Sequence, residues 1–169
     1  MLSTFHFPLS TLKVGIIGPE STGKSTLAQS LAEQFGGIYI KEYARTYVEN
    51  LNRAYTYKDV EAIARHQIEE LDKRQKTDAL KDKRLMPIFF DTELIVTKVW
   101  FEVKYGSCPD WLEEAIAQYP MDFYILCYPD IDWKPDPVRE NPAIREELFA
   151  RYLQEVKKTG VPYYIYYHD

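Results

Sequence analysis

The sequence predicts an α/β domain in which helices cover both faces of a parallel five-stranded sheet. Short apolar runs alternate with longer amphipathic segments along the chain, and this alternation is typical of βαβ units in a three-layer sandwich. The length of 169 residues fits one domain, and 46% apolar residues supply its core. We therefore expect residues 1–169 to form a single domain, without internal repeats or low-complexity linkers.

The first half of the chain contains two expected strands and three expected helices. Residues 12–17 are apolar and rich in β-branched side chains, and Gly18 ends the run, so this segment predicts a buried strand. Apolar residues then recur at helical spacing until Gly36 and Gly37 stop the pattern. The elements expected here are strands at 12–17 and 38–40 and helices at 25–35, 43–51 and 58–81.

The second half continues the alternation, with one irregular stretch. Four prolines lie between Pro129 and Pro142, which predicts an ordered but mobile loop. A last helix follows this loop and ends near residue 158. The other elements expected here are strands at 86–90, 123–128 and 163–167 and a helix at 94–103.

Composition and charge exclude several classes of function. The chain has 21 Lys and Arg against 26 Asp and Glu, a net charge of −5, which is the wrong sign for a protein whose main partner is a phosphate backbone. No apolar run approaches the roughly 18 residues of a membrane span, and residues 1–12 lack the features of a signal peptide. We therefore expect a cytoplasmic protein with no nucleic-acid or membrane partner. Cys108 and Cys127 form no CxxC pair, which favours structural thiols over a zinc site.

The segment from Gly18 to Ser25 carries the strongest functional signal. It matches the phosphate-binding loop pattern G-x4-G-K-S/T and lies between an expected strand and an expected helix, as in a P-loop NTPase fold. We expect Lys24 to reach the β and γ phosphates of ATP, and the Ser25 hydroxyl to bind Mg²⁺. The alternative is a glycine-rich turn with an exposed lysine. The residues expected to bind ATP are Gly18, Glu20, Ser21, Thr22, Gly23, Lys24, Ser25 and Thr26.

Asp91 is the expected second anchor for Mg²⁺. It follows a buried strand whose carboxyl end would face the phosphate loop, where ligands bind in open α/β sheets. Asp91 could instead cap the next helix, as Thr92 could. Glu93 is close enough to share the site, so the choice between Asp91 and Glu93 stays open.

The segment at about 129–145 favours a kinase over a motor or a switch. Thr92 follows Asp91 where AAA-type ATPases usually carry Glu, and the chain has no Asn-Lys-x-Asp tetrapeptide for guanine. A transferase needs a lid that excludes water and brings arginine to the transferred phosphoryl group. Arg139 and Arg145 are the candidates in this lid, although Arg145 could instead pair with a glutamate of its own helix.

A pocket for the second substrate is expected where the strand at 38–40 ends. Glu42 could take a hydroxyl proton or hold ribose hydroxyls, and Tyr43 and Trp133 could stack a base. The alternatives are a surface ion pair between Glu42 and Arg45, and ordinary packing for the two rings. His66 is expected to be solvated. The expected catalytic residues are Lys24, Asp91, Glu42 and Arg139, and the expected acceptor-binding residues are Glu42, Tyr43, Arg45, Asp91 and Trp133.

Taken in order, these motifs resemble a known family. The ribosylnicotinamide kinase domain of the trifunctional bacterial NAD-biosynthesis regulator is similar over about residues 12–167. The resemblance implies transfer of the ATP γ-phosphate to the 5′-hydroxyl of nicotinamide riboside with Mg²⁺, with Glu42 and Asp91 orienting ribose and metal and the 133–139 loop as the lid. The matching segments are 18–26, 42–45, 90–93, Thr97 with Trp100 through Gly106, and 133–139.

The chain departs from the family pattern in three places. It lacks the DNA-binding and adenylyltransferase domains, so neither activity is expected. Lys41 stands where an aromatic residue would stack on the nicotinamide ring, and a cation suits an anionic acceptor better. The chain ends at Asp169, where the family continues into an adenine-contacting loop and a helix. The alternatives are therefore a kinase for another nucleoside or a nucleotide, and an ATP-binding regulatory module whose 58–81 helix contacts a partner. The oligomeric state is not predicted.

Overall fold

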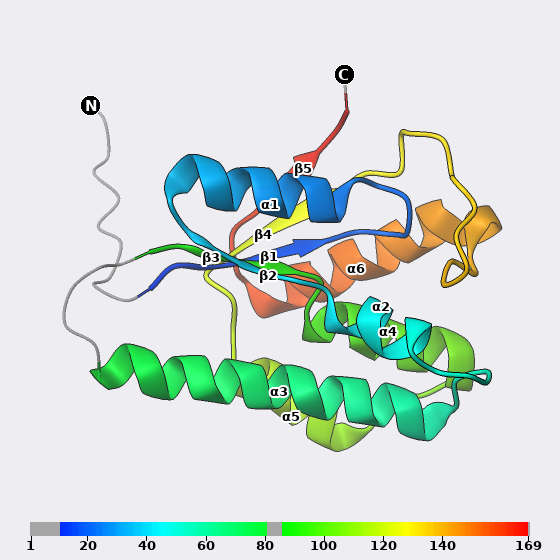
Figure 1. Ribbon diagram of the computed structural model, residues 1–169, viewed down its shortest axis with the longest axis horizontal. Coiled ribbons are helices and arrows are strands. Elements are labelled where there is room, and N and C mark those ends of the chain that lie inside the picture. The colour runs from blue at the N-terminus through cyan, green and yellow to red at the C-terminus, as the bar shows by residue number, and fades with distance from the viewer. Residues whose placement is uncertain (1–10, 81–85, 169) are drawn as a thin grey trace.

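The computed structural model describes residues 11–80 and 86–168. Within them, five parallel strands form one sheet in the order β2-β3-β1-β4-β5 (Figure 1). The central position of β1 brings the segment that follows it close to the ends of both neighbouring strands. The strands are β1 (Lys13–Ile17), β2 (Ile38–Ile40), β3 (Ile88–Asp91), β4 (Phe123–Cys127) and β5 (Tyr163–Tyr166).

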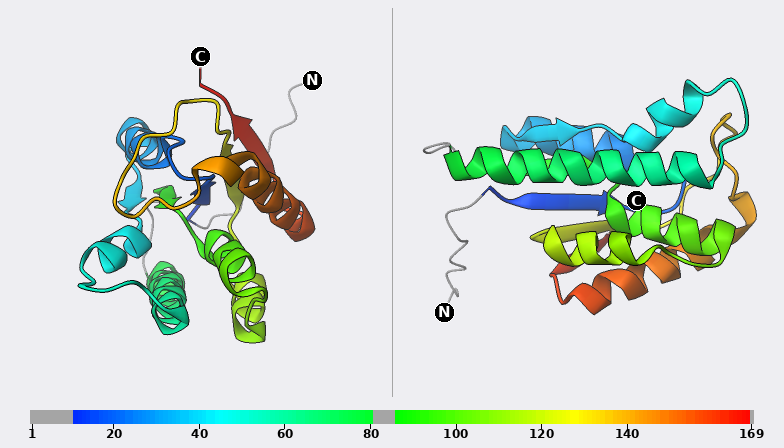
Figure 2. Two further views of the ribbon diagram at one scale, coloured as in Figure 1. Left: turned by 90° about the vertical axis from the view of Figure 1, so that its right-hand side faces the viewer. Right: turned by 90° about the horizontal axis from the view of Figure 1, so that it is seen from below.

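Helices cover both faces of this sheet, which confirms the predicted three-layer P-loop NTPase fold. In Figures 1 and 2, α1 lies on one face, and α3, α4, α5 and α6 lie on the other. The helices are α1 (Lys24–Phe35), α2 (Tyr43–Glu49), α3 (Tyr57–Leu80), α4 (Leu94–Tyr105), α5 (Asp110–Gln118) and α6 (Arg145–Thr159), which follows the short 3-10 turn η1 (Pro142–Ile144).

Strand side chains alternate between the two faces of the sheet, and this alternation determines the face on which Asp91 lies. Ile16 of β1 and Phe89 of β3 are buried under α1, whereas Ile17 and Phe90 belong to the larger core on the other face. Successive side chains of a strand point to opposite faces. Asp91, two residues after Phe89, therefore lies on the face of α1.

For most strands and helices, the expected first and last residues lie within two positions of the observed ones. Residue 81, the expected last residue of the long helix, lies outside the described residues. Helix α5 was not expected; Pro109 precedes it, Asp110 and Glu113 lie in its first turn, and Leu112 and Ala115 are its buried residues. These are ordinary signals of a helix start and an apolar stripe. None of the helices of the described segments is long and apolar enough to span a membrane.

Candidate active site

The loop between β1 and α1 holds a conformation that requires its two glycines. Gly18 has φ 155° and Gly23 has φ 70°, and a Cβ on Gly18 would lie 2.6 Å from the carbonyl oxygen of Cys127. The Thr22 hydroxyl donates a hydrogen bond to the carbonyl of Pro19 at 2.8 Å and closes the loop. No side chain caps the start of α1. The free amides of its first turn therefore face the space where an anion would bind.

The lysine and the two hydroxyl residues of the motif lie at this helix start. Lys24 donates a hydrogen bond from Nζ to the carbonyl oxygen of Pro19 at 2.7 Å. Ser25 and Thr26 are exposed in the first turn of α1 and line a cavity of about 290 Å³ together with the rest of the loop. The hydrogen bond of Lys24 within its own loop holds the side chain beside the residues that a phosphate group would touch.

Asp91 lies at the end of β3 with an incomplete set of hydrogen bonds. It is only 2% exposed; its Oδ2 accepts a hydrogen bond from the Tyr39 hydroxyl at 3.1 Å, and its Oδ1 is buried without a partner among residues 11–80 and 86–168. Burial raises the pKa of Tyr39 to about 12, helped by Asp91 and Glu42 and opposed by a hydrogen bond with Ser25. The Tyr39 hydroxyl thus links Asp91 to Ser25 of the phosphate loop. A buried carboxylate oxygen without a donor fits a site for a cation or its water shell.

Glu93 has a different role, which separates the two acids that the sequence left as alternatives. The chain turns at Thr92, where φ is 72°. Glu93 then caps α4 by accepting a hydrogen bond from the amide of Ile95 at 2.9 Å, so neither Asp91 nor Thr92 is the cap. Its side chain packs against Gly15 on the face opposite α1, and burial raises its pKa to about 7.

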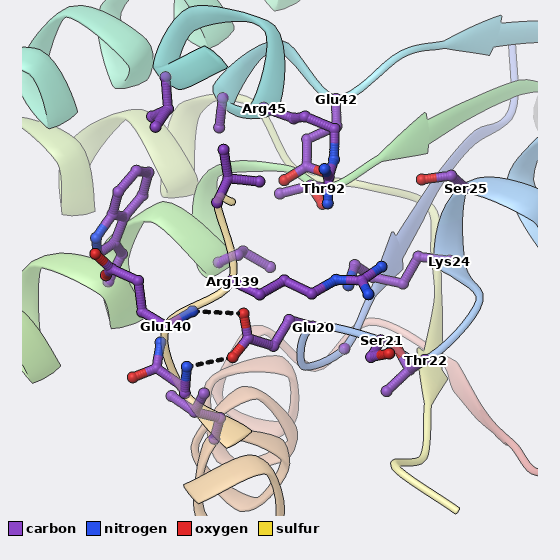
Figure 3. A pocket seen from close by; sticks show the side chains of 18 of the residues that line it. Glu20, Ser21, Thr22, Lys24, Ser25, Glu42, Arg45, Thr92, Arg139 and Glu140 are labelled. Carbon is purple, nitrogen blue, oxygen red and sulfur yellow. Dashed lines mark hydrogen bonds between the residues drawn. The ribbon is translucent and has the colours of Figure 1, made fainter. Parts of the chain in front are cut away.

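The 129–145 segment crosses the mouth of the phosphate loop (Figure 3). The Glu20 carboxylate accepts hydrogen bonds from the backbone amides of Glu140, at 2.9 Å, and Asn141. The Ser21 hydroxyl accepts one from the amide of Lys134 at 3.0 Å. Glu20 and Ser21, which were expected to bind ATP, thus hold this segment through their side chains.

Two arginines of this segment take different positions. Arg145 donates hydrogen bonds to the carbonyl oxygens of Ser21 at 3.3 Å and Ile131 at 2.9 Å, so it joins the loop to the segment rather than pairing along its own helix. Arg139 extends into the cavity toward the loop (Figure 3). One of its nitrogens donates to the carbonyl of Lys134 at 2.6 Å, while its Nε is buried without a partner.

On the far side of the cavity, Glu42 directly precedes α2 and is half-buried, and its side chain makes no capping hydrogen bond within the described residues. Burial raises the pKa of Glu42, the positive charge of Lys24 opposes this shift, and the charge of Asp91 adds to it. Arg45 pairs with Asp136 at 2.9 Å and with Glu49 at 3.3 Å. The ion pair between Glu42 and Arg45, considered from the sequence, is therefore replaced by a contact between α2 and the 129–145 segment.

The residues expected to stack a base do not meet in the main cavity. Tyr43 stacks on His66 with ring centroids 3.6 Å apart, so the expectation that His66 is solvated was wrong. Both rings and Lys41 line a second cavity of about 250 Å³, which shares Glu42 with the main one. Trp133 lines neither of these two cavities, and its indole N–H is buried without a partner.

Two functional candidates, Tyr55 and His168, were missed because their contacts come from distant parts of the chain. Tyr55 and Trp100 line the main cavity with ring centroids 5.0 Å apart, and the Tyr55 hydroxyl donates to Glu140 at 2.5 Å. The ring of His168 lies 3.0 Å from the point where a Cβ of Gly23 would stand, and its Nδ1 bonds Asp130 at 2.7 Å. A tyrosine in a loop and a histidine near the chain end carry no local signal for such contacts.

Known proteins match this chain over most of its length. The trifunctional NAD biosynthesis/regulator protein NadR of Salmonella typhimurium strain LT2 is 28% identical over 158 residues, and the same protein of Escherichia coli K12 is 30% identical over 154 residues. These alignments cover 90% and 88% of this chain but 37% and 36% of the relatives. The chain therefore spans just over a third of the length of these curated relatives.

Solved structures match the fold. A NadR crystal structure in complex with NR has a TM-score of 0.73 at 22% identity and covers 92% of this chain and 45% of that one. Thymidylate kinase from Ehrlichia chaffeensis has a TM-score of 0.63 at 13% identity, covering 95% of this chain and 88% of that one. A family model described as an AAA domain matches residues 13–168. Because this match spans nearly the whole chain, the protein belongs to that AAA domain family, and the predicted resemblance is confirmed.

Proposed function

We propose that this domain is a small-molecule kinase that transfers the γ-phosphate of ATP to a hydroxyl group of a nucleoside, with nicotinamide riboside as the favoured acceptor. One observation carries the proposal. The phosphate loop, Glu42 and Arg139 line a single cavity, and the buried Asp91 accepts a hydrogen bond from the Tyr39 hydroxyl, which also interacts with Ser25 of that loop. A phosphate group, a second substrate and a cation would meet in such an arrangement.

The donor side would act by positioning and charge neutralisation. The free amides of α1 and the Lys24 ammonium group would hold the phosphate oxygens once Lys24 leaves the carbonyl of Pro19. Ser25 and Asp91 would hold Mg²⁺, since the Asp91 Oδ1 has no other partner. The bound ion would supply positive charge against the phosphate oxygens.

The acceptor side would orient the attacking hydroxyl and exclude water. Glu42 would accept the hydroxyl proton or hold ribose, and burial raises its pKa, which makes it a stronger proton acceptor than an exposed carboxylate. The edge-to-face rings of Tyr55 and Trp100 offer an apolar wall for a base. We propose that the 129–145 segment is the lid and that Arg139 neutralises charge on the transferred group.

The relatives support this choice of acceptor. Those matched in sequence are named as NAD biosynthesis regulators, and a structural neighbour was solved in complex with NR. Other structural neighbours are kinases of thymidylate and deoxyadenosine. Transfer to a nucleoside or nucleotide is the chemistry that these names share.

The test is a product assay with purified protein, ATP, Mg²⁺ and nicotinamide riboside. We expect the mononucleotide to form. Lys24→Ala should reduce the rate of its formation by at least about 100-fold, because the variant lacks the positive charge that would stabilise the phosphoryl group in the transition state. Lys76→Ala is the matched control, since Lys76 pairs with Asp72 on the surface of α3. Background ATP hydrolysis alone, across a panel of nucleosides, would show that the domain is not a kinase of this class.

A second acceptor class is favoured by Lys41. This residue lines the second cavity, where its positive charge would attract an anionic acceptor such as a nucleotide. Competition between nicotinamide riboside and nucleoside monophosphates for the same ATP-dependent reaction distinguishes the two classes. A Lys41→Trp variant should shift the preference toward the cationic riboside if Lys41 faces the bound base.

A further inference from the structure

The Tyr39 hydroxyl is a polar group bonded to Asp91, the proposed metal acid, and the proposed mechanism does not use it. Tyr39 lies opposite Phe89 in the register of β2 and β3, and Phe89 packs under α1. Residues opposite each other in neighbouring strands share a face. The ring of Tyr39 therefore lies on the same side of the sheet as Asp91 and the first turn of α1.

This placement gives Asp91 one direct donor and leaves one oxygen open. The hydroxyl of Tyr39 donates to Oδ2 of Asp91 at 3.1 Å, whereas Oδ1 has no partner although the residue is 2% exposed. Lys24, a cation of the loop, donates to the carbonyl of Pro19 instead. With Oδ2 held by the tyrosine, rotation of the carboxylate is restricted, and Oδ1 is the oxygen left for a cation.

We propose that Tyr39 is a positioning residue that orients Asp91 for the divalent ion accompanying ATP. This inference rests on the proposed function, since it concerns the ion of that same site. Tyr39 does not touch the transferred group; it acts through Asp91, as donors behind metal-binding carboxylates do. β2 is an edge strand of the sheet and Tyr39 is half-buried, so removal of one oxygen atom leaves the packing of the ring intact.

The test is a Mg²⁺ titration followed by thermal stabilisation, with a non-hydrolysable ATP analogue at fixed concentration. Wild-type protein should gain melting temperature as Mg²⁺ is added. Tyr39→Phe should need about tenfold more Mg²⁺ for half of the effect, the usual cost of losing a donor behind a metal ligand. Each curve is measured from the unliganded melting temperature of the same variant, so a change in fold stability alone does not move its midpoint.

Two comparisons make the result specific. Tyr119→Phe removes a similar hydrogen bond, from Tyr119 to Asp72 at 3.2 Å and remote from the loop, and should leave the Mg²⁺ midpoint unchanged. In an Asp91→Asn background, Tyr39→Phe should add no further increase, because the carboxylate that it orients is gone.

The outcomes separate this inference from the proposed function. An unchanged or lowered Mg²⁺ midpoint in Tyr39→Phe, with normal stabilisation of the wild type, would overturn the role of Tyr39 alone; a lowered midpoint would mean that the hydroxyl competes with the ion. An equal increase with and without Asp91 would also overturn it. Absence of any Mg²⁺-dependent stabilisation of the wild type would reject both the kinase proposal and this one.

Discussion

Asp91 and Glu93 are two buried acids at the end of the same strand, and the fold gives them opposite tasks. Asp91 lies on the face of α1 and is bonded to Tyr39, and its other carboxylate oxygen has no partner within the described residues. Glu93 lies on the other face, caps α4 and packs against Gly15. In a continuous strand, residues two positions apart point to the same face, so Asp91 and Glu93 would share one. The chain instead turns at Thr92, where φ is 72°, and Glu93 lies on the other face.

The difference shows how a fold gives two neighbouring acids different hydrogen-bonding environments. The amide of Ile95 donates a local hydrogen bond to Glu93. Burial raises the pKa of Glu93 to about 7, so the carboxyl group keeps its proton up to a higher pH than an exposed glutamate does. Asp91 lies on the face of α1, and within the described residues its one hydrogen bond comes from the Tyr39 hydroxyl rather than from a backbone amide. A buried carboxylate with an oxygen that accepts no hydrogen bond is the better ligand for a cation.

The largest expected effect tests this separation directly. Asp91→Asn should reduce phosphoryl transfer by about 100-fold or more, because the amide has no charge to hold the ion that accompanies ATP. Glu93→Gln should leave the rate within about tenfold of the wild type, since the glutamine oxygen can still accept from the amide of Ile95. The measurement is kcat for the nucleoside acceptor at saturating Mg²⁺. Equal losses in the two variants would contradict the assignment of Asp91 as the metal acid.

The next effect concerns the free energy of unfolding and its dependence on pH. Burial raises the pKa of Glu93 from 4.5 to about 7, so the folded state binds this proton more tightly than the unfolded state. The wild type therefore loses stability as pH rises from 4.5 to 7. Glu93→Gln has no such proton, and its stability relative to the wild type should rise over this window by up to about 3 kcal/mol.

Urea unfolding at about pH 5 and about pH 8 measures this change. The difference between variant and wild type should grow with pH. Asp110→Asn, in the first turn of α5, is the control because the Asp110 side chain is exposed. A difference between Glu93→Gln and wild type that stays constant with pH would mean that Glu93 ionises normally in the folded protein.

Sequence reasoning could propose the ATP-binding half of the candidate site because its signals are local. The phosphate loop and the acid after β3 each follow a strand within a few residues, and strand spacing alone predicts which way Asp91 points. The contacts of the 129–145 segment could not be read in this way, since Glu20 meets Glu140 and Arg45 meets Asp136 only after the chain has folded. Residues that act through such long-range contacts include Tyr39, Tyr55, His66 and His168.

The smallest expected effect tests the contact between α2 and the 129–145 segment, which the sequence did not predict. Arg45 joins α2 to the 129–145 segment by donating to both carboxylate oxygens of Asp136, at 3.0 and 2.9 Å. Because this pair is partly exposed, its loss should cost about 1 kcal/mol, so Arg45→Met and Asp136→Asn should each lower kcat/KM by about fivefold. Glu49→Gln removes the other partner of Arg45, at 3.3 Å, and should have almost no effect.

The double variant shows whether the pair acts as a single link between α2 and the proposed lid. If Arg45 and Asp136 matter only through each other, combining Arg45→Met with Asp136→Asn should cost no more than either change alone. Asp136 also accepts a hydrogen bond from the amide of Val138 at 3.1 Å, which an asparagine oxygen can retain, so the fold of the segment itself should survive. Additive losses would indicate that each side chain acts separately, for example by contacting a substrate, and that the closed position of the segment does not depend on this ion pair.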